Sequence, residues 1–384
     1  MRICDVVLNS IWCDPRVRKQ IVSYLQNNCE VSCVGLKCTR YDAEKVSQIP
    51  CKVSLAEYNP KYAGKQRGFL RYYKYFRKFQ ILNRDICNLI IEQKPDVIHA
   101  NDLDALFPAY KAAKKLNCKL IYDSHEINTQ NAYYRDKKLY CIYLSLKEKY
   151  LVKRINRMVC VSNAAADYFE KELKIEKPLV VTNCSLKAEQ YISTEKNSGF
   201  EIINHGQFYE GRGYDVMLEA SSLLKEYPEI KLAIRGYGVM EEQLRERAEE
   251  LKADNFIFYP PVTVDKLIES ASHSAVGVAI TEAICLNFKL SVSNKLFEYA
   301  SAGLPVIMSD IPEHRYLNNK YKFGVVLEND TPQAFADAVL KLYTDKEFYN
   351  SCAENAKKLS DEINWENEFG KLINEERNML ENNC

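Results

Sequence analysis

The sequence predicts an α/β protein made of two Rossmann-like, doubly wound domains that face each other across a cleft. The length of 384 residues suits two hydrophobic cores better than one. Short apolar runs alternate with longer amphipathic stretches, and one polar stretch, residues 185–199, interrupts the alternation. Strand–helix–strand alternation indicates right-handed crossovers and a mostly parallel sheet on each side of that stretch.

The strand-like runs form two sets. The first set comprises residues 3–8, 31–35, 96–100, 119–123, 158–162 and 179–182, and the second comprises residues 201–204, 230–234, 256–259, 275–280, 305–308 and 324–327. We expect an N-terminal domain over 1–188, a C-terminal domain over 189–364 and a helix over 365–384 that packs back toward the N-terminal domain. In open parallel sheets ligands bind beyond the carboxyl ends of the strands, so a site is expected where two such edges meet.

Composition excludes several classes of protein. A net charge of +1 gives no sign of nucleic-acid binding, and the longest apolar runs are strand-sized. The first residues are typical of a strand and not of a signal peptide. Fourteen scattered cysteines without a C-x-x-C pair indicate reduced thiols and a cytoplasmic location. No metal site is expected: the histidines are far apart, and we interpret the D-x-D of Asp102 and Asp104 as a loop.

Glycines follow two predicted strands of the second half. Residues 205–208 follow one strand, the Gly-Arg-Gly of 211–213 precedes a helix, and the Gly-Tyr-Gly of 236–238 ends another strand. Glycines let the backbone approach a phosphate closely, and the guanidinium of Arg212 offers it several donors. Each glycine alone is also typical of a turn, but their order favours a phosphate site.

A predicted helix start in the same half also suits an anion. Ser293 precedes the helix 294–301, whose free N–H groups and positive dipole end favour a diphosphate. Glu298 lies one turn further on, where its carboxylate can accept hydrogen bonds from sugar hydroxyls.

In this order the residues resemble family 4 of the glycosyltransferases, which are retaining enzymes with the two-domain B-type fold, and the resemblance covers nearly the whole chain. The family's N-K-x-x-E-Y-x-x-x-G-x-P-V pattern is matched by Asn294, Lys295, Glu298, Tyr299, Gly303, Pro305 and Val306. Its donor-phosphate element is matched by Gly206, Arg212 and Gly213, and its G-x-G element by Gly236 and Gly238. In the first half, residues 14–17, 96–102 and 122–126 resemble family segments.

The resemblance implies sites for a nucleotide diphosphate sugar and for an acceptor. The implied donor-binding residues are Gly206, Gln207, Arg212, Gly236, Gly238, Val262, Ser293, Asn294, Lys295, Leu296 and Glu298. The implied catalytic residues are His125, Arg212, Lys295 and Glu298, and the implied acceptor-binding residues are Asp14, Arg16, His99 and Asp102. The implied reaction needs no metal or cofactor and moves a sugar, first of all from a UDP-sugar, to a saccharide or lipid-linked saccharide of a cell-surface polysaccharide or glycolipid.

Two departures from the family pattern leave alternatives open. The family's E-x7-E has Leu290 at its first position, and the arginine that commonly follows the first glycine is Gln207. A sugar-nucleotide 2-epimerase of the same fold and a non-catalytic nucleotide-sugar-binding module therefore remain alternatives. Asp14 and Arg16 can also serve as a helix cap and an ion pair, and His99 as a hydrogen-bonded histidine at a strand end.

Residues 61–84 contain eight basic and no acidic residues. At 100° per residue, aromatic side chains gather on one face of this predicted helix and basic side chains on the other. The segment predicts either peripheral contact with an anionic membrane, at its inner face, or a helix packed on the N-terminal sheet.

Overall fold

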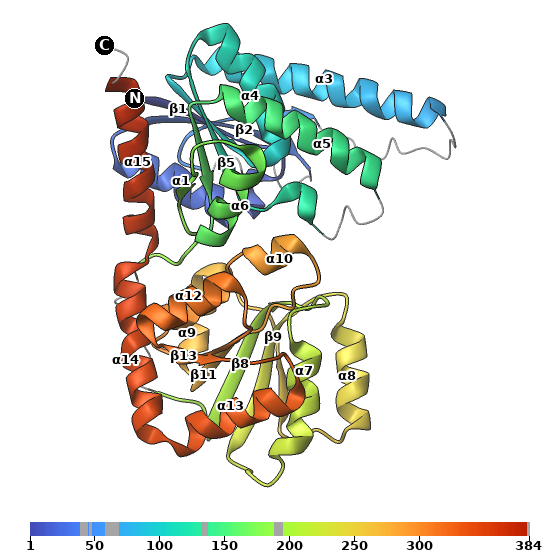
Figure 1. Cartoon of the computed structure of the whole chain (residues 1–384), viewed down its shortest axis with the longest axis vertical. Helices are drawn as coiled ribbons and strands as arrows, with labels where there is room; N and C mark the ends of the chain where they lie inside the picture. The colour runs from blue at the N-terminus through green and yellow to red at the C-terminus, as the bar shows by residue number, and fades with distance from the viewer. Residues whose placement is uncertain (39–44, 46–47, 58–68, 132–136, 188–194, 382–384) are drawn as a thin grey trace. The chain divides into compact units, whose positions relative to one another are not determined.

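The computed structural model describes residues 1–38, 45, 48–57, 69–131, 137–187 and 195–381, and within 69–76 it describes the backbone alone. The chain divides into two compact units (Figure 1). The first unit comprises Met1–Val181 with Phe369–Cys384, and the second comprises Thr182–Glu368. The expected domain boundary after residue 188 lies inside the range of the second unit.

The first unit contains a seven-stranded parallel sheet in the order β3-β2-β1-β4-β5-β6-β7. Its strands are β1 (Arg2–Val7), β2 (Glu30–Lys37), β3 (Lys52–Glu57), β4 (Val97–Asn101), β5 (Lys119–Ser124), β6 (Arg157–Cys160) and β7 (Leu179–Val180). The β1 strand lies between β2 and β4, and Asp5 pairs in register with His99. The neighbouring pair of β4 and β5 brings Asn101 opposite Asp123.

Helices flank both sides of this sheet (Figure 1). They are α1 (Pro15–Gln26), α3 (Phe69–Gln93), α4 (Asp102–Leu116), α5 (Lys138–Leu151), α6 (Asn163–Leu173) and the 3-10 turns η1 (Ile11–Cys13), η4 (Asn128–Gln130) and η6 (Val152–Arg154). The α1 helix begins where it does because Asp14 accepts hydrogen bonds from the backbone N–H groups of Arg16 and Val17, and Pro15 occupies the first turn.

The second unit contains a six-stranded parallel sheet in the order β10-β9-β8-β11-β12-β13. Its strands are β8 (Phe200–Gln207), β9 (Ile230–Tyr237), β10 (Phe256–Tyr259), β11 (Val276–Ala279), β12 (Val306–Met308) and β13 (Gly324–Val326). The second sheet thus has the 3-2-1-4-5-6 order of a Rossmann-like fold, and the first has the same order with a seventh strand at its edge. The predicted class, two Rossmann-like α/β domains, is confirmed.

The helices of the second unit again lie on both sides of its sheet (Figure 1). They are α7 (Tyr214–Ala220), α8 (Glu241–Glu250), α9 (Leu267–Ser272), α10 (Leu286–Leu290), α11 (Asn294–Ser301), α12 (Pro312–Tyr321), α13 (Pro332–Thr344) and α14 (Lys346–Glu362), with the 3-10 turns η7 (Ser221–Leu224) and η8 (Val264–Lys266). A cluster of buried side chains from β8, β9 and β11 and from α7 and α13 forms the core.

The last helix, α15 (Trp365–Glu381), buries one stripe of its side chains. Trp365, Phe369, Leu372 and Glu376 are all buried. The Phe369 ring packs edge-on against Tyr24 of α1 with centroids 4.9 Å apart, and α15 runs beside α1 in Figure 1. Burying a side chain of the size of Phe369 stabilises the folded state by roughly 1.5–3 kcal/mol.

Two local interpretations of the sequence were wrong or incomplete. The D-x-D segment that begins at Asp102 is not a loop: Asp102 is the first residue of α4. It can start the helix directly after β4 because its backbone adopts a left-handed φ of +66°. The edge strand β3 was not predicted at all. No helix among the described residues is long and apolar enough to cross a membrane.

Candidate active site

In the second unit, the glycine-rich segments meet at one edge of the sheet. Gly206, the second-last residue of β8, lies in register with Gly236, the second-last residue of β9, and Val262 follows the end of the next strand, β10. Gly206 and Gly236 have φ values of +133° and +149°. A Cβ atom on Gly236 would lie 1.8 Å from the carbonyl oxygen of Gly206, so this position accepts only glycine.

A buried lysine lies over Gly206. Lys295, in the first turn of α11, donates a hydrogen bond from Nζ to Oδ1 of Asn204 at 2.7 Å. A Cβ atom on Gly206 would lie 3.4 Å from Cε of Lys295. Burial, and secondly the positive charge of Arg212, lower the pKa of Lys295 to about 7. The ammonium form of Lys295 therefore lacks a nearby negative charge that would stabilise it, and an anion beside Gly206 would supply that charge.

Glu298 lies one turn further along α11 and is held by a histidine. His205 Nε2 and Glu298 Oε2 are 2.6 Å apart, and the backbone N–H of His205 donates to the hydroxyl of Tyr299. Because Nε2 must carry a proton to donate to a carboxylate, His205 is the donor in this pair. The Glu298 side chain remains 24% exposed, so its carboxylate can also accept hydrogen bonds from a ligand.

Tyr214 supplies an unsatisfied donor at the same place. Its hydroxyl is buried and has no hydrogen-bond partner among the described residues. A Cβ atom on Gly206 would lie 3.4 Å from this hydroxyl, and Nζ of Lys295 lies 5.2 Å from the centre of its ring. A buried polar atom without a partner is rare in folded proteins, and here it faces the glycine turn where the sequence predicts a phosphate.

The other predicted donor residues differ in what they can offer. Gln207 is exposed and donates to the hydroxyl of Tyr237. The guanidinium of Arg212 lies 4.7 Å from the ring centre of Phe288. The Leu296 side chain is completely buried, so only its backbone can contact a ligand. A Cβ atom on Gly238 would lie 2.5 Å from the carbonyl oxygen of Phe208.

The start of α11 lacks a side-chain cap. Ser293 occupies the capping position without making a capping hydrogen bond, and Asn294 is the first helical residue. The Ser293 N–H donates instead to Nε2 of His314. Burial lowers the pKa of His314 to about 4, which keeps this nitrogen an acceptor at neutral pH. The unpaired N–H groups expected in the first turn of a helix favour an anion there.

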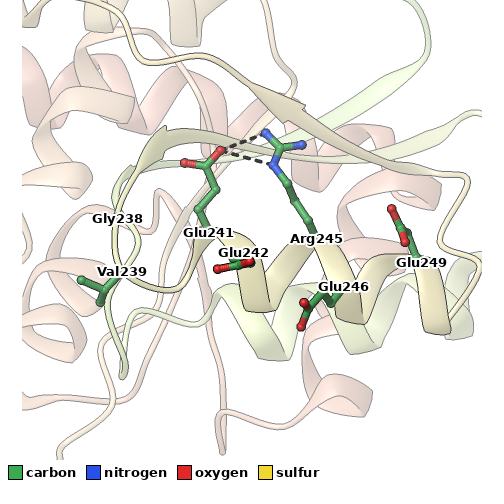
Figure 2. Close-up of a pocket in the computed structure, with 7 residues that line it drawn as sticks. All are labelled: Gly238, Val239, Glu241, Glu242, Arg245, Glu246 and Glu249. Carbon is green, nitrogen blue, oxygen red and sulfur yellow. Dashed lines mark hydrogen bonds and ion pairs between the residues drawn. The ribbon is translucent and has the colours of Figure 1, made fainter.

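A surface hollow lies beside the second glycine pair but has the wrong charge for a diphosphate. It is lined by Gly238, Val239, Glu241, Glu242, Arg245, Glu246 and Glu249 (Figure 2). Arg245 binds the carboxylate of Glu241 through Nε and Nη2. Since the other glutamates add further negative charge to one face of α8, this hollow would repel an anionic ligand.

In the first unit, a buried carboxylate organises several predicted residues. Asp123, at the end of β5, accepts hydrogen bonds on Oδ2 from Nη2 of Arg16 at 2.7 Å and from Nε2 of Gln20 at 2.9 Å. The side chain of Arg16 is 3% exposed and that of Asp123 is 0% exposed. Burial raises the pKa of Asp123, but Arg16 and His125 outweigh it and hold this pKa well below its usual range.

His99 lies behind this carboxylate, out of reach of solvent. Its Nε2 is 3.3 Å from Oδ2 of Asp123, and its Nδ1 is 3.1 Å from the hydroxyl of Tyr24 and 3.5 Å from Oε1 of Glu376. Burial lowers the pKa of His99, but hydrogen bonds to Asp123 and Glu376 raise it to about 10. The resulting imidazolium fixes the orientation of Asp123 from its buried side.

His125 lies on the outer side of the same carboxylate. Its Nε2 is 3.1 Å from Oδ1 of Asn101 and 3.5 Å from Oδ2 of Asp123, and its Nδ1 is 3.5 Å from Oδ2 of Asp102. Burial lowers the pKa of His125, whereas Asp102 and Asp123 raise it, with a net increase. The side chain is 15% exposed, so His125 can contact a ligand at the end of β5.

Asp14 stands apart from this cluster. Its carboxylate caps α1 and also accepts a hydrogen bond from Nδ2 of Asn9. Leu290, where the family has a glutamate, is half-buried at the end of α10. Of the predicted membrane segment 61–84, residues 61–68 and the side chains of 69–76 lie outside the described part of the chain.

Family models match both units. The model described as Glycosyltransferase Family 4 matches residues 17–186, and the model described as Glycosyl transferases group 1 matches residues 187–359. The two matches together span residues 17–359, most of the chain. The chain belongs to the family 4 glycosyltransferases. The predicted family and enzyme class are confirmed.

Known proteins are similar to this glycosyltransferase in sequence or in fold. The GDP-mannose:cellobiosyl-diphosphopolyprenol alpha-mannosyltransferase of Xanthomonas oryzae pv. oryzae (strain PXO99A) is 22% identical over 295 residues, 74% of each chain. Sucrose-phosphate synthase from Thermosynechococcus elongatus has a TM-score of 0.78 at 14% identity and covers 99% of both chains. Anabaena HepE in complex with UDP and glucose has a TM-score of 0.74 at 13% identity over 97% of this chain and 98% of that one.

Sequence reasoning missed some residues that complete these clusters. Asn204, His205 and Tyr214 complete the group around Gly206, and Asp123 and Gln20 complete the group around His125. A usable signal exists for some of them. Polar residues within otherwise apolar strands, near the carboxyl end of the strand, are costly to bury unless they have partners or a function.

Proposed function

We propose that this glycosyltransferase is a retaining enzyme that moves a sugar from a nucleotide diphosphate sugar, with UDP as the preferred nucleotide, to a saccharide or lipid-linked saccharide acceptor. The observation that carries the donor half of the proposal is the group around Gly206. It combines a buried lysine with a lowered pKa, a buried hydroxyl without a partner and a backbone that only glycine allows. A diphosphate would supply the negative charge and the acceptor atoms that this group lacks.

Each part of the donor has a matching group in the second unit. Arg212, Lys295 and the start of α11 would hold the diphosphate, Glu298 would accept hydrogen bonds from the ribose hydroxyls, and the backbone at Val262 would contact the base. The leaving nucleotide diphosphate gains negative charge in the transition state, and cations already aimed at it lower the barrier. Two cations at this position make transfer feasible without a metal.

The first unit supplies the residues for the acceptor side. His125 would contact the reacting sugar, since it is the partly exposed member of the Asp123 cluster. Arg16 and His99 would act through Asp123, because both are buried against that carboxylate. Asp102 would orient His125, and Asp14 would act by capping α1.

The choice of nucleotide and acceptor draws on similar proteins. The HepE structures contain UDP or UDP-glucose, whereas the Xanthomonas mannosyltransferase is named for GDP-mannose and for a cellobiosyl-diphosphopolyprenol acceptor. We favour UDP as the nucleotide because of the HepE structures. We favour a lipid-linked saccharide in cell-surface polysaccharide or glycolipid assembly as the acceptor because of the mannosyltransferase. Leu290 implies that the donor sugar is contacted differently from the family pattern.

A transfer assay tests this proposal. The enzyme would be incubated with a panel of UDP- and GDP-sugars and polyprenyl-diphosphate-linked saccharides, and the products analysed by mass spectrometry and NMR. The proposal predicts one extended saccharide whose new linkage keeps the anomeric configuration of the donor. An inverted linkage would refute the retaining mechanism. Conversion of the donor to its C2 epimer without any acceptor would instead show an epimerase.

A further inference from the structure

Helix α5 carries an apolar surface that no described residue covers. Six of its large side chains are exposed to solvent: Leu139, Tyr140, Ile142, Tyr143, Leu146 and Tyr150. Leu139 is 85% exposed and Leu146 is 65% exposed. Two of the tyrosine rings, Tyr140 and Tyr143, stack on each other with centroids 6.4 Å apart. Single exposed apolar residues are ordinary, but a contiguous group marks a surface that binds something.

The spacing of these residues shows that the surface is a regular helix face. Residues 139, 142, 143, 146 and 150 follow the i, i+3, i+4, i+7, i+11 pattern and span an arc of about 100°. The opposite side of α5 is the one that packs on the protein, through Leu144, Glu148 and Leu151, which are buried. The helix therefore has two apolar faces, and the fold uses only one of them.

Among the described residues of α5 and η6, the charged side chains beside this outer face are all positive. Lys138 and Lys149 flank it on one side, and Lys147 flanks it on the other, where its ammonium lies 3.5 Å from the ring centre of Phe107. Lys153 and Arg154 follow in η6. The single acidic residue of α5, Glu148, is buried and accepts a hydrogen bond from the hydroxyl of Tyr122.

We propose that α5 docks this enzyme onto an anionic phospholipid surface, with its outer apolar face, defined by Leu139, Ile142, Tyr143, Leu146 and Tyr150, at the level of the headgroups. An amphipathic helix with aromatic and aliphatic residues on one face and lysines beside them is the form that lies in a membrane interface. Tyrosine favours that interface, and lysines reach the lipid phosphates from it. The inference goes beyond the proposed transfer reaction and does not depend on it.

The positive charge beside the outer face of α5 favours an anionic membrane over a second copy of the chain as its binding partner. In a two-fold dimer through α5, the same lysine-flanked face would meet itself, so like charges would be brought together. An anionic membrane instead neutralises every lysine at once.

This surface is separate from the predicted membrane segment 61–84, because none of the residues that define it lies in that segment. The α3 helix does lie next to it: Lys147 Nζ is 5.7 Å from the ring centre of Phe79.

Co-sedimentation of the full chain with vesicles tests the proposal. At low salt we expect binding to phosphatidylcholine vesicles that contain phosphatidylglycerol, and little binding to pure phosphatidylcholine. The Lys138→Glu/Lys149→Glu variant should lower the partition coefficient by about 25-fold or more, since each lysine near an anionic surface contributes about five-fold. A matched control, Lys346→Glu/Lys357→Glu on α14, changes the net charge equally and should bind nearly as the wild type does.

A second pair of variants isolates the apolar contribution. Ile142→Ser/Leu146→Ser should abolish most of the vesicle binding, whereas Val22→Ser/Leu223→Ser, which removes two exposed apolar side chains elsewhere, should not. Nucleotide-induced thermal shifts of all variants report whether the donor unit is intact. A general loss of these shifts would therefore count against the proposed function and not against docking.

Three results would overturn the docking proposal. The first is a wild-type protein that stays in the supernatant with anionic vesicles at low salt. The second is an Ile142→Ser/Leu146→Ser variant that sediments as the wild type does. The third is light scattering that shows a dimer in the wild type and a monomer in this variant, without vesicle binding, because α5 would then be an interface between two copies of the chain.

Discussion

We predict that Lys295 makes the affinity for a nucleotide diphosphate depend on pH. In the free protein, burial and the nearby Arg212 lower its pKa to about 7, from an ordinary value of 10.5. A bound diphosphate would favour the ammonium form and raise this pKa again. Well below pH 7 the ammonium is already present, so Lys295 adds no further pH dependence there. As the pH rises above 7, binding must take up a proton, and affinity should fall.

The size of the effect follows from the fraction of charged lysine. With a pKa of about 7 in the free protein, about half of the molecules carry the charge at pH 7 and about one in a hundred at pH 9. If the charged form alone binds well, the dissociation constant for UDP should rise about 50-fold between these two values. The ligand does not cause the change, because its terminal phosphate, with a pKa of about 6, is already ionised at pH 7.

Isothermal titration calorimetry in buffers of different ionisation enthalpy measures both quantities. We expect uptake of about half a proton on binding at pH 7 and nearly one at pH 9. A Lys295→Arg variant is the matched control: its charge persists throughout, so its affinity should change little with pH. A wild-type affinity that is flat from pH 7 to 9, without proton uptake, would refute the assignment of Lys295 to the diphosphate.

Other substitutions test the remaining parts of the account. Arg212→Ala should leave the melting temperature unchanged but lower kcat by about 10²–10³-fold, and near-wild-type turnover would remove Arg212 from the transition state. Arg16→Met removes the shortest ion pair of the buried Asp123 and leaves its contacts with His99, His125 and Gln20, so chemical denaturation should show a loss of stability of at most about 3–5 kcal/mol. An unchanged free energy of unfolding would contradict a stabilising role for this pair. Gly236→Ala should displace the backbone at Gly206 and abolish UDP binding; unchanged binding would contradict the tight glycine packing.

Much of the fold could be predicted from the sequence because buried parallel strands consist almost entirely of apolar residues. Strands such as β4 and β11 are buried along their whole length, so they appear as short apolar runs. The β3 strand was missed because it lies at the edge of its sheet and is mostly half-exposed, with lysine, serine and glutamate in its sequence. The α5 helix is hard to recognise from sequence because a second apolar face takes the place of much of the polar face that marks a surface helix.

The sequence predicts the candidate site only where residues close together in the chain form a pattern, as the glycines and the start of a helix do. The pair of Lys295 and Asn204 joins residues 91 positions apart, and the pair of Arg16 and Asp123 joins residues 107 positions apart. Neither pair follows from a local pattern, since each depends on the order of strands in the sheet. The lowered pKa of Lys295 and the unsatisfied hydroxyl of Tyr214 likewise arise from burial in the folded chain.

The most direct test of the donor site is a thermal melt of the wild-type protein with UDP, GDP, ADP and dTDP, each well above its expected dissociation constant. A ligand at 100 times its Kd stabilises the folded state by roughly 2.7 kcal/mol, which raises the Tm of a chain of this size by a few degrees. The account predicts such a shift with UDP and a smaller shift or none with the other nucleotides. A folded protein whose Tm does not move with any of the four would contradict it.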